Sequence, residues 1–79
     1  MNWQDRIISN PEILSGKAAV KGTRLSVEFI LERLASGWTE NDLLSNYPRL
    51  TREDLQAVYA YAYEGLKDGL LFLPSRYAA

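Results

Sequence analysis

The sequence predicts a mainly α-helical domain in which three helices follow a short N-terminal β-hairpin. Three observations support this fold class. Apolar residues in the later part of the chain recur at the i, i+3, i+4, i+7 spacing of a single helix face. Serine and threonine residues, which favour helix N-caps, stand directly before these apolar repeats. Short β-prone runs separated by turn residues occupy the first part of the chain.

Length and composition restrict the class of protein. The 79 residues suffice for one small domain, and a core of that size supplies roughly 3–5 kcal/mol of stability. There is no cysteine and no histidine, so disulfides, zinc sites with nitrogen and sulfur ligands, and the usual Cys–His and Ser–His–Asp nucleophile systems are excluded. We therefore expect no enzyme activity, no metal and no cofactor, and we expect added stability from a partner or a second copy.

Charge and hydropathy restrict the partners. The net charge of -1 argues against a strongly basic nucleic-acid-binding domain but allows a local basic patch. No apolar run approaches the roughly 18 residues of a membrane span, and the N-terminus lacks the apolar segment of a secretory signal. We expect a cytoplasmic protein that does not contact a membrane.

Residues 1–25 form the predicted β-hairpin and turn. Ile7-Ile8-Ser9 is the first β-prone run, and Asn10-Pro11 ends it because this dipeptide favours a turn. Ala18-Ala19-Val20 is a weaker second strand. Gly22 is expected to turn the chain toward the first helix, since glycine adopts backbone angles that other residues resist.

Residues 26–68 form the predicted three-helix unit. The first helix spans residues 26–36, with Ser26 as its N-cap and Gly37 as its stop. Its apolar face consists of four residues at helical spacing: Val27, Ile30, Leu31 and Leu34. The second helix, residues 39–46, is short; Thr39 caps it, and Pro48 ends it by disfavouring helical angles at the preceding residue.

The third predicted helix extends from Thr51 to about Lys67 and is ended by Asp68-Gly69. Thr51 and Asp54 fit a capping box with aspartate in the last place. The expected apolar face consists of Leu55, Val58, Tyr59, Ala62 and Leu66. A short helix, a four-residue turn and a longer helix outline a helix-turn-helix, so the three helices predict a homeodomain-like or winged-helix bundle.

Several short motifs identify a known pattern: Gly16-Lys17, Lys21-Gly22-Thr23-Arg24-Leu25, Val27-Glu28, Gly37-Trp38-Thr39, Tyr47-Pro48, Leu50-Thr51, Asp54-Leu55 and Ala60-Tyr61-Ala62. In these motifs the sequence resembles the small bacterial family called domain of unknown function 433, while Ser15 and Ala18-Ala19 depart from its pattern. The resemblance implies an antitoxin-like protein with a helix-turn-helix. It implies a PIN-like ribonuclease toxin as the partner. We further expect the chain to bind operator DNA as a homodimer. A stand-alone helix-turn-helix transcription regulator and a dimeric interaction module without DNA binding remain the alternatives.

The predicted DNA contacts lie near the start of the third helix and on the basic stretch before the first: Arg49, Thr51, Arg52, Gln56, Lys21 and Arg24. In a helix-turn-helix the start of the second helix of the motif reads base edges, for which arginine and glutamine are suited. Thr51 is alternatively a cap only, and Arg24 is alternatively a donor to carbonyl groups of a neighbouring loop. The acidic pair Glu53-Asp54 counts against phosphate contact at this helix start.

Residues 69–79 form an apolar C-terminal tail. An exposed apolar run is a liability for a monomer, so we predict that this run contacts a partner or a second copy through Leu70, Leu71, Phe72 and Leu73. The alternative is that the tail folds back on the helices. By analogy with other antitoxins, Arg76 is predicted to enter an acidic site of the toxin, since arginine pairs well with clustered carboxylates.

Overall fold

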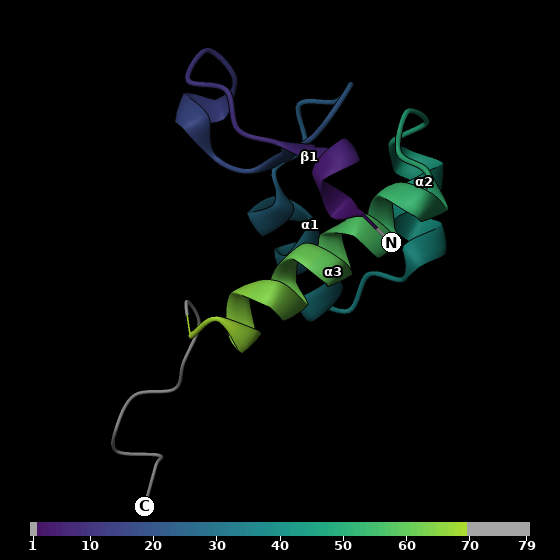
Figure 1. Ribbon diagram of the computed structural model, residues 1–79. Coiled ribbons are helices and arrows are strands. Elements are labelled where there is room, and N and C mark those ends of the chain that lie inside the picture. The colour runs from purple at the N-terminus through teal and green to yellow at the C-terminus, as the bar shows by residue number, and fades with distance from the viewer. Residues whose placement is uncertain (1, 70–79) are drawn as a thin grey trace, which may run out of the picture.

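Three α-helices and a two-stranded antiparallel sheet make up the fold (Figure 1), which confirms the predicted class. The structure is a computed structural model that describes residues 2–69. Two short 3-10 helices, η1 and η2, flank the first strand. The elements in chain order are η1 (Trp3–Asp5), β1 (Ile7–Ile8), η2 (Leu14–Gly16), β2 (Ala19–Val20), α1 (Val27–Ala35), α2 (Glu40–Asn46) and α3 (Arg52–Lys67).

The predicted hairpin is confirmed. β1 and β2 pair antiparallel, with Ile7 opposite Val20 and Ile8 opposite Ala19. A two-residue ladder is marginal by itself, but three of these four side chains are buried, which ties the hairpin to the helices. Burial against the helices therefore stabilises the sheet more than its own hydrogen bonds do.

The helix boundaries agree with the predicted ones to within one residue because each helix begins at its predicted cap. The Ser26 hydroxyl accepts the N–H of Phe29 at 2.9 Å. Thr39 and Asp42 form a reciprocal capping box before α2, and Thr51 forms the same arrangement with its partner aspartate before α3. Gly37, with φ of 104°, ends α1 in the left-handed conformation that favours glycine.

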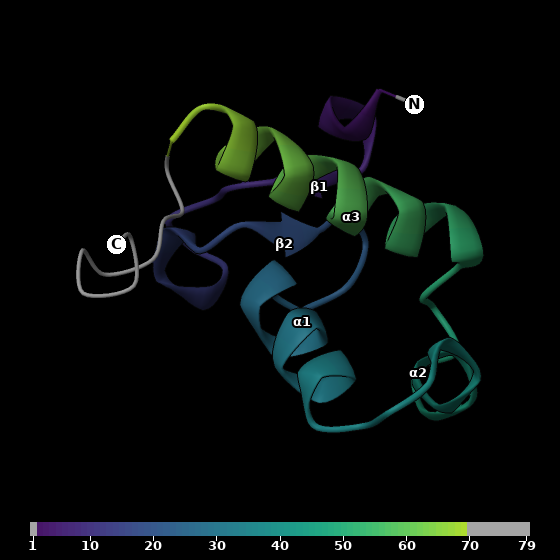
Figure 2. The ribbon, with the colours of Figure 1, turned by 90° about the horizontal axis from the view of Figure 1, so that it is seen from below.

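The core receives side chains from the hairpin, from all three helices and from the turn before α3. Its buried members are Ile7, Val20, Val27, Ile30, Leu43, Leu50, Leu55, Ala57 and Val58. The prediction that Leu66 belongs to the apolar face of the third helix is wrong, since its side chain is 58% exposed. Leu66 lies in the last turns of α3, which extend past α1 (Figures 1 and 2).

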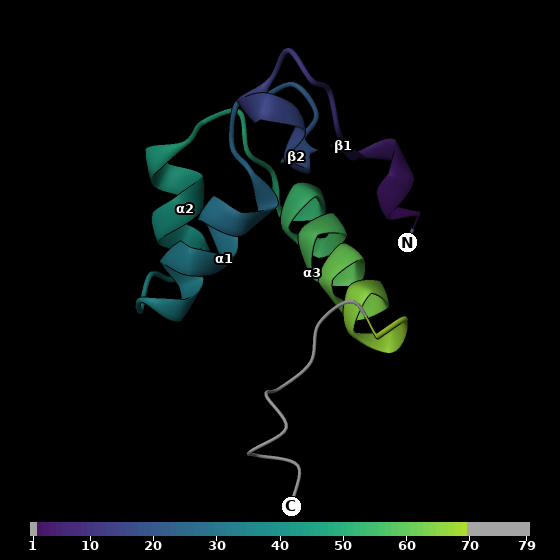
Figure 3. The ribbon, with the colours of Figure 1, turned by 90° about the vertical axis from the view of Figure 1, so that its left-hand side faces the viewer.

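α3 lies in the middle of the molecule. Figure 3 shows α1 and α2 to one side of α3 and η1 to the other, and Figure 2 shows the same arrangement from another direction. Direct contacts join α3 to α2, to β1 and to η1. The helix that would read DNA is therefore flanked on two sides, and its open surface is the remaining outer stripe, which contains Glu53, Gln56 and Tyr63.

Polar contacts fasten α2 to α3. Arg52 pairs with Glu40 at 3.4 Å and donates to the side-chain oxygen of Asn41 at 2.9 Å. The Tyr59 hydroxyl donates to Glu40 at 2.7 Å. Burial, and next the hydrogen bond to Glu40 and its negative charge, raise the pKa of Tyr59 to about 12.

The raised pKa of Tyr59 predicts a stability change at alkaline pH. In the unfolded chain a tyrosine titrates near pH 10, so between about pH 10 and 12 the unfolded state loses a proton that the folded state keeps. The stabilisation is therefore fully present below about pH 10 and disappears as the pH approaches 12. We expect urea titrations to show a larger loss of unfolding free energy between about pH 9 and 11 for the wild type than for Tyr59→Phe. Equal losses for the two proteins would contradict this assignment.

None of the helices within residues 2–69 is long and apolar enough to cross a lipid bilayer.

Candidate nucleic-acid interface

The predicted DNA contacts come from two loops and from the start of α3. Lys21 and Arg24 lie on the loop between β2 and α1, and Arg49 lies on the turn between α2 and α3. The fold brings the loop and the turn together, since the Arg49 guanidinium donates to the carbonyl oxygen of Gly22 at 3.5 Å. The sequence suggested that Arg24 donates a hydrogen bond to a carbonyl group of a neighbouring loop. In the structure Arg49 makes such a bond, and Arg24 forms no side-chain hydrogen bond within residues 2–69.

The loop between β2 and α1 is held in one conformation by its own hydrogen bonds. The Val20 N–H donates to the carbonyl of Leu25 at 3.0 Å. The Thr23 hydroxyl donates to the Val20 carbonyl at 2.8 Å and accepts the Leu25 N–H at 3.1 Å. Gly22, at φ of 83°, makes the turn that the sequence predicted. The loop therefore holds the exposed side chains of Lys21 and Arg24 on a fixed backbone.

Some of the basic side chains form ion pairs within the protein, whereas the three that are predicted to contact phosphates do not. Within the described residues, ion pairs engage Arg6, Lys17, Arg33 and Arg52. Lys21, Arg24 and Arg49 form no ion pair with any residue in that range, and we call these three residues the cationic end. All three are exposed. An exposed cation that is not held in an ion pair is the kind of group that binds phosphate in a nucleic-acid complex.

At the start of α3, Thr51 and Arg52 already form contacts within the protein. The Thr51 hydroxyl accepts the N–H of Asp54 at 3.1 Å, which is the cap role given as the alternative. Arg52 is engaged by α2, although an exposed pair of this kind contributes only about 0–1 kcal/mol and can be exchanged for a DNA contact. Gln56 is exposed and forms no side-chain hydrogen bond with the described residues. Of the base-reading candidates, Gln56 is the one already open to solvent.

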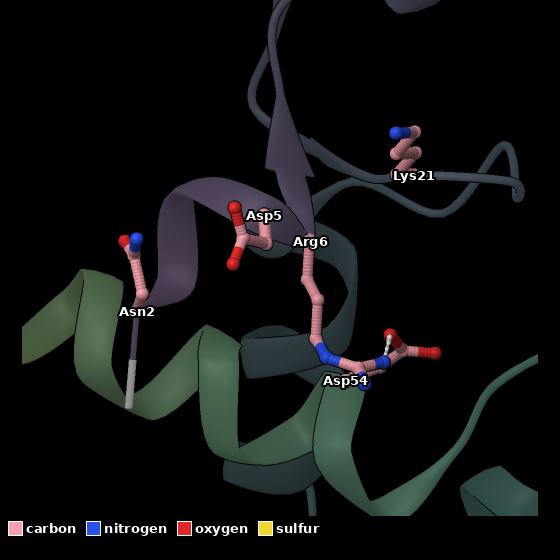
Figure 4. A pocket seen from close by; sticks show the side chains of 5 residues that line it. All are labelled: Asn2, Asp5, Arg6, Lys21 and Asp54. Carbon is pink, nitrogen blue, oxygen red and sulfur yellow. Dashed lines mark hydrogen bonds and ion pairs between the residues drawn. The ribbon is translucent and has the colours of Figure 1, made fainter.

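An ion pair between the half-buried Arg6 and the buried Asp54 was not predicted from the sequence. The Asp54 side chain is 8% exposed, and one of its oxygens accepts a hydrogen bond from Arg6 at 3.1 Å (Figure 4). The other oxygen accepts the Thr51 N–H at 3.0 Å. Asp54 is thus not an exposed acid at the start of α3, and only Glu53 remains as the acidic residue that counts against phosphate contact. The capping pattern signals Asp54, but nothing in the sequence identifies Arg6, which is 48 positions away.

Arg6 also reaches the basic loop through its backbone. Its carbonyl oxygen accepts the N–H of Lys21 at 2.7 Å, so one residue connects α3 to the loop that carries part of the cationic end. The preceding η1 is anchored further along α3 by Trp3. The Trp3 ring meets Tyr61 edge-on with centroids 5.0 Å apart, and its indole N–H donates to Glu64.

Comparison with known proteins decides the family. Residues 7–62 match the family described as "Protein of unknown function (DUF433)". The chain belongs to the DUF433 family. It is similar to a DUF433 member protein from Anabaena variabilis ATCC 29413, whose crystal structure matches with a TM-score of 0.75 and 32% sequence identity over 82% of this chain and 64% of that one. The chain thus spans about 64% of the length of that relative. No curated protein shows significant similarity.

The DUF433 match includes the hairpin, α1, α2 and most of α3, with the cationic end and Asp54 inside it. The matched range begins one residue after Arg6, and η1 lies outside it. The predicted partner contacts also lie outside it, and they lie outside the described residues: Leu70, Leu71, Phe72, Leu73 and Arg76.

One hollow of this DUF433 protein is lined by polar and charged side chains, but these are not arranged as a binding site. It has a volume of about 440 Å³ and is lined by Asn2, Asp5, Arg6, Lys21 and Asp54. Figure 4 shows Asp5 and Lys21 pointing away from the Arg6 guanidinium, so the charged groups do not converge on a common point. Within residues 2–69 there is no group of three or more side chains suited to hold a metal ion.

Proposed function

We propose that this protein is an antitoxin-like DNA-binding protein that neutralises a PIN-like ribonuclease and binds operator DNA as a dimer. Membership of the DUF433 family, together with the resemblance of its motifs to antitoxin-like proteins, supports the toxin partner. The single observation that supports DNA binding is the cationic end, whose three exposed cations form no ion pair within residues 2–69 and lie on the β2–α1 loop and on the α2–α3 turn that contacts it.

The cationic end would hold phosphates while the start of α3 faces the bases. Lys21 and Arg24 would contact the backbone as a wing does, and Arg49 would do so from the turn. Gln56 would read a base edge, for which the amide group suits adenine. One copy has few such contacts, and a dimer doubles them, so the affinity is expected to depend on dimer formation.

The surface at the other end of α3 supports a protein partner. Tyr63 is 64% exposed and Leu66 is 58% exposed, and both lie in the last two turns of α3, before the apolar tail. Tyrosine and other aromatic residues are enriched where proteins contact one another. The partner contact would continue from these two residues into residues 70–79.

Growth rescue tests the antitoxin function. We expect co-expression of the full chain with the nuclease encoded beside its gene to restore growth that the nuclease alone prevents. Removal of residues 70–79 is expected to abolish the rescue, because it removes the predicted partner contacts. Circular dichroism of the shortened chain serves as the control that residues 2–69 still fold. Failure of the full chain to restore growth, or absence of any nuclease gene beside it, would contradict the antitoxin function.

A mobility shift on the DNA upstream of the gene tests operator binding. The wild type is expected to shift this DNA at low salt, and the shift is expected to weaken at higher salt because counterion release drives the binding. No shift at low salt would contradict the DNA-binding role. A shift without growth rescue would leave a stand-alone transcription regulator as the function.

A further inference from the structure

A second hollow lies between the β2–α1 loop and the α2–α3 turn. Its volume is about 660 Å³, within the range of roughly 300–1,000 Å³ that ligand sites occupy. Ile13, Leu25, Tyr47 and Pro48 form its apolar lining, and Arg24 and Arg49 belong to its rim. We call it the loop–turn hollow.

The walls of the loop–turn hollow are held in place. The Tyr47 ring meets Phe29 edge-on with centroids 5.8 Å apart, which fixes the ring against α1. The loop that carries Leu25 is pinned by the hydrogen bonds of Thr23. A site whose walls are already ordered loses little conformational entropy when a ligand binds.

The chemistry of the hollow combines two features. Its guanidinium groups form no ion pair with the described residues, so they are available to an anion. Among its apolar residues, Ile13, Leu25 and Tyr47 are half-buried and Pro48 is exposed, so all of them gain from being covered. A ligand that satisfies both carries a carboxylate or phosphate next to a large apolar group. A DNA backbone supplies phosphates but has no large hydrocarbon or aromatic group to cover Ile13 and Tyr47.

We propose that the loop–turn hollow binds an acidic peptide segment of a partner protein, in which an aspartate or glutamate adjoins a leucine or an aromatic residue. Arginine forms paired hydrogen bonds with carboxylates, and the apolar neighbour would cover Ile13, Leu25 and Tyr47. The inference rests on the proposed function in one respect: the partner would be the protein that the antitoxin-like chain neutralises. Since Arg24 and Arg49 also belong to the cationic end, a bound peptide and bound DNA exclude each other.

Selection from a random dodecamer peptide library on the full-length chain tests this site. We expect enrichment of peptides in which acidic and large apolar residues are adjacent. Their affinity is expected to fall about tenfold or more for the Arg24→Ala/Arg49→Ala double variant, which loses two charge-assisted contacts. It is expected to fall about fivefold for Ile13→Ser, which keeps the charges and removes apolar surface. Lys67→Ala, an exposed cation at the far end of α3, serves as the matched control.

The outcomes separate this inference from the proposed function. Enrichment of basic peptides, or of peptides that bind the double variant as well as the wild type, would overturn the inference and leave DNA binding and growth rescue standing. A selected peptide that fails to displace upstream DNA from the wild type would also overturn it, because the shared arginines require competition. If no peptide were selected and Ile13→Ser weakened DNA binding as strongly as Arg49→Ala, the occupant of the hollow would be nucleic acid. Circular dichroism of each variant shows whether it is folded.

Discussion

Replacement of Leu43 by alanine is expected to lower the free energy of unfolding by about 3 kcal/mol. Leu43 is the only residue of α2 that is fully buried, and its side chain has no exposed surface. Polar contacts at Glu40 and Asn41 also join α2 to α3, and they are weaker. Since a domain of this size has roughly 3–5 kcal/mol in total, the variant is expected to be close to unfolded at room temperature.

Thermal and urea unfolding followed by circular dichroism measure this effect. The midpoint temperature is expected to fall by roughly 12–24 °C, given about 4–8 °C per kcal/mol for a domain of this size. Leu66→Ala is the matched control, since it removes the same atoms from an exposed position and is expected to change stability by less than about 0.5 kcal/mol. Equal effects of the two substitutions would contradict the packing of α2 described above.

Asp54→Ala is expected to cost about 2–3 kcal/mol. The substitution removes the acceptor of the Thr51 N–H, which costs about 1 kcal/mol as a lost cap. It also removes a charge-assisted hydrogen bond from Arg6, which contributes about 1.5–3 kcal/mol when well shielded. The expected loss is smaller than the two upper values added together, because the Arg6 side chain is 40% exposed and can recover contacts with water.

Two controls isolate the role of Asp54. Asp54→Asn keeps one acceptor and loses the charge, so about half of the stability loss is expected. Glu53→Ala removes the neighbouring acid from the same first turn, where its side chain is exposed, and is expected to cost less than about 0.5 kcal/mol. A loss for Glu53→Ala as large as that for Asp54→Ala would show that negative charge at the helix end, and not the Arg6–Asp54 ion pair, causes the loss of stability.

The helix boundaries could be predicted because caps are local. Ser26, Thr39 and Thr51 each bond to a backbone N–H three residues later, and such a contact depends on sequence spacing alone. The positive φ at Gly22 was predictable for the same reason. These features depend on no contact with a distant part of the chain.

The parts that could not be predicted depend on contacts between distant segments. Periodicity places Leu66 on the same helix face as Leu55, but it cannot tell that α3 continues past α1. The pairing of Arg6 with Asp54 joins residues 48 positions apart, and no local pattern indicates it.

The candidate site shows the same division. Sequence alone identified Lys21 and Arg24 as one basic stretch and Arg49 as part of a separate turn. The fold places loop and turn side by side, and it engages Arg52 and the Thr51 hydroxyl in contacts within the protein. The cationic end and the loop–turn hollow are therefore products of the tertiary structure.

The salt dependence of operator binding tests the role of the cationic end most directly. The measurement compares the slope of log affinity against log salt for the wild type with that of the triple variant Lys21→Ala/Arg24→Ala/Arg49→Ala, and Lys67→Ala is the control. Each phosphate contact contributes about 0.9 to the slope, so the triple variant is expected to lose about 3 units per protomer and the control none. An unchanged slope in the folded triple variant, or no binding by the wild type at low salt, would contradict the account.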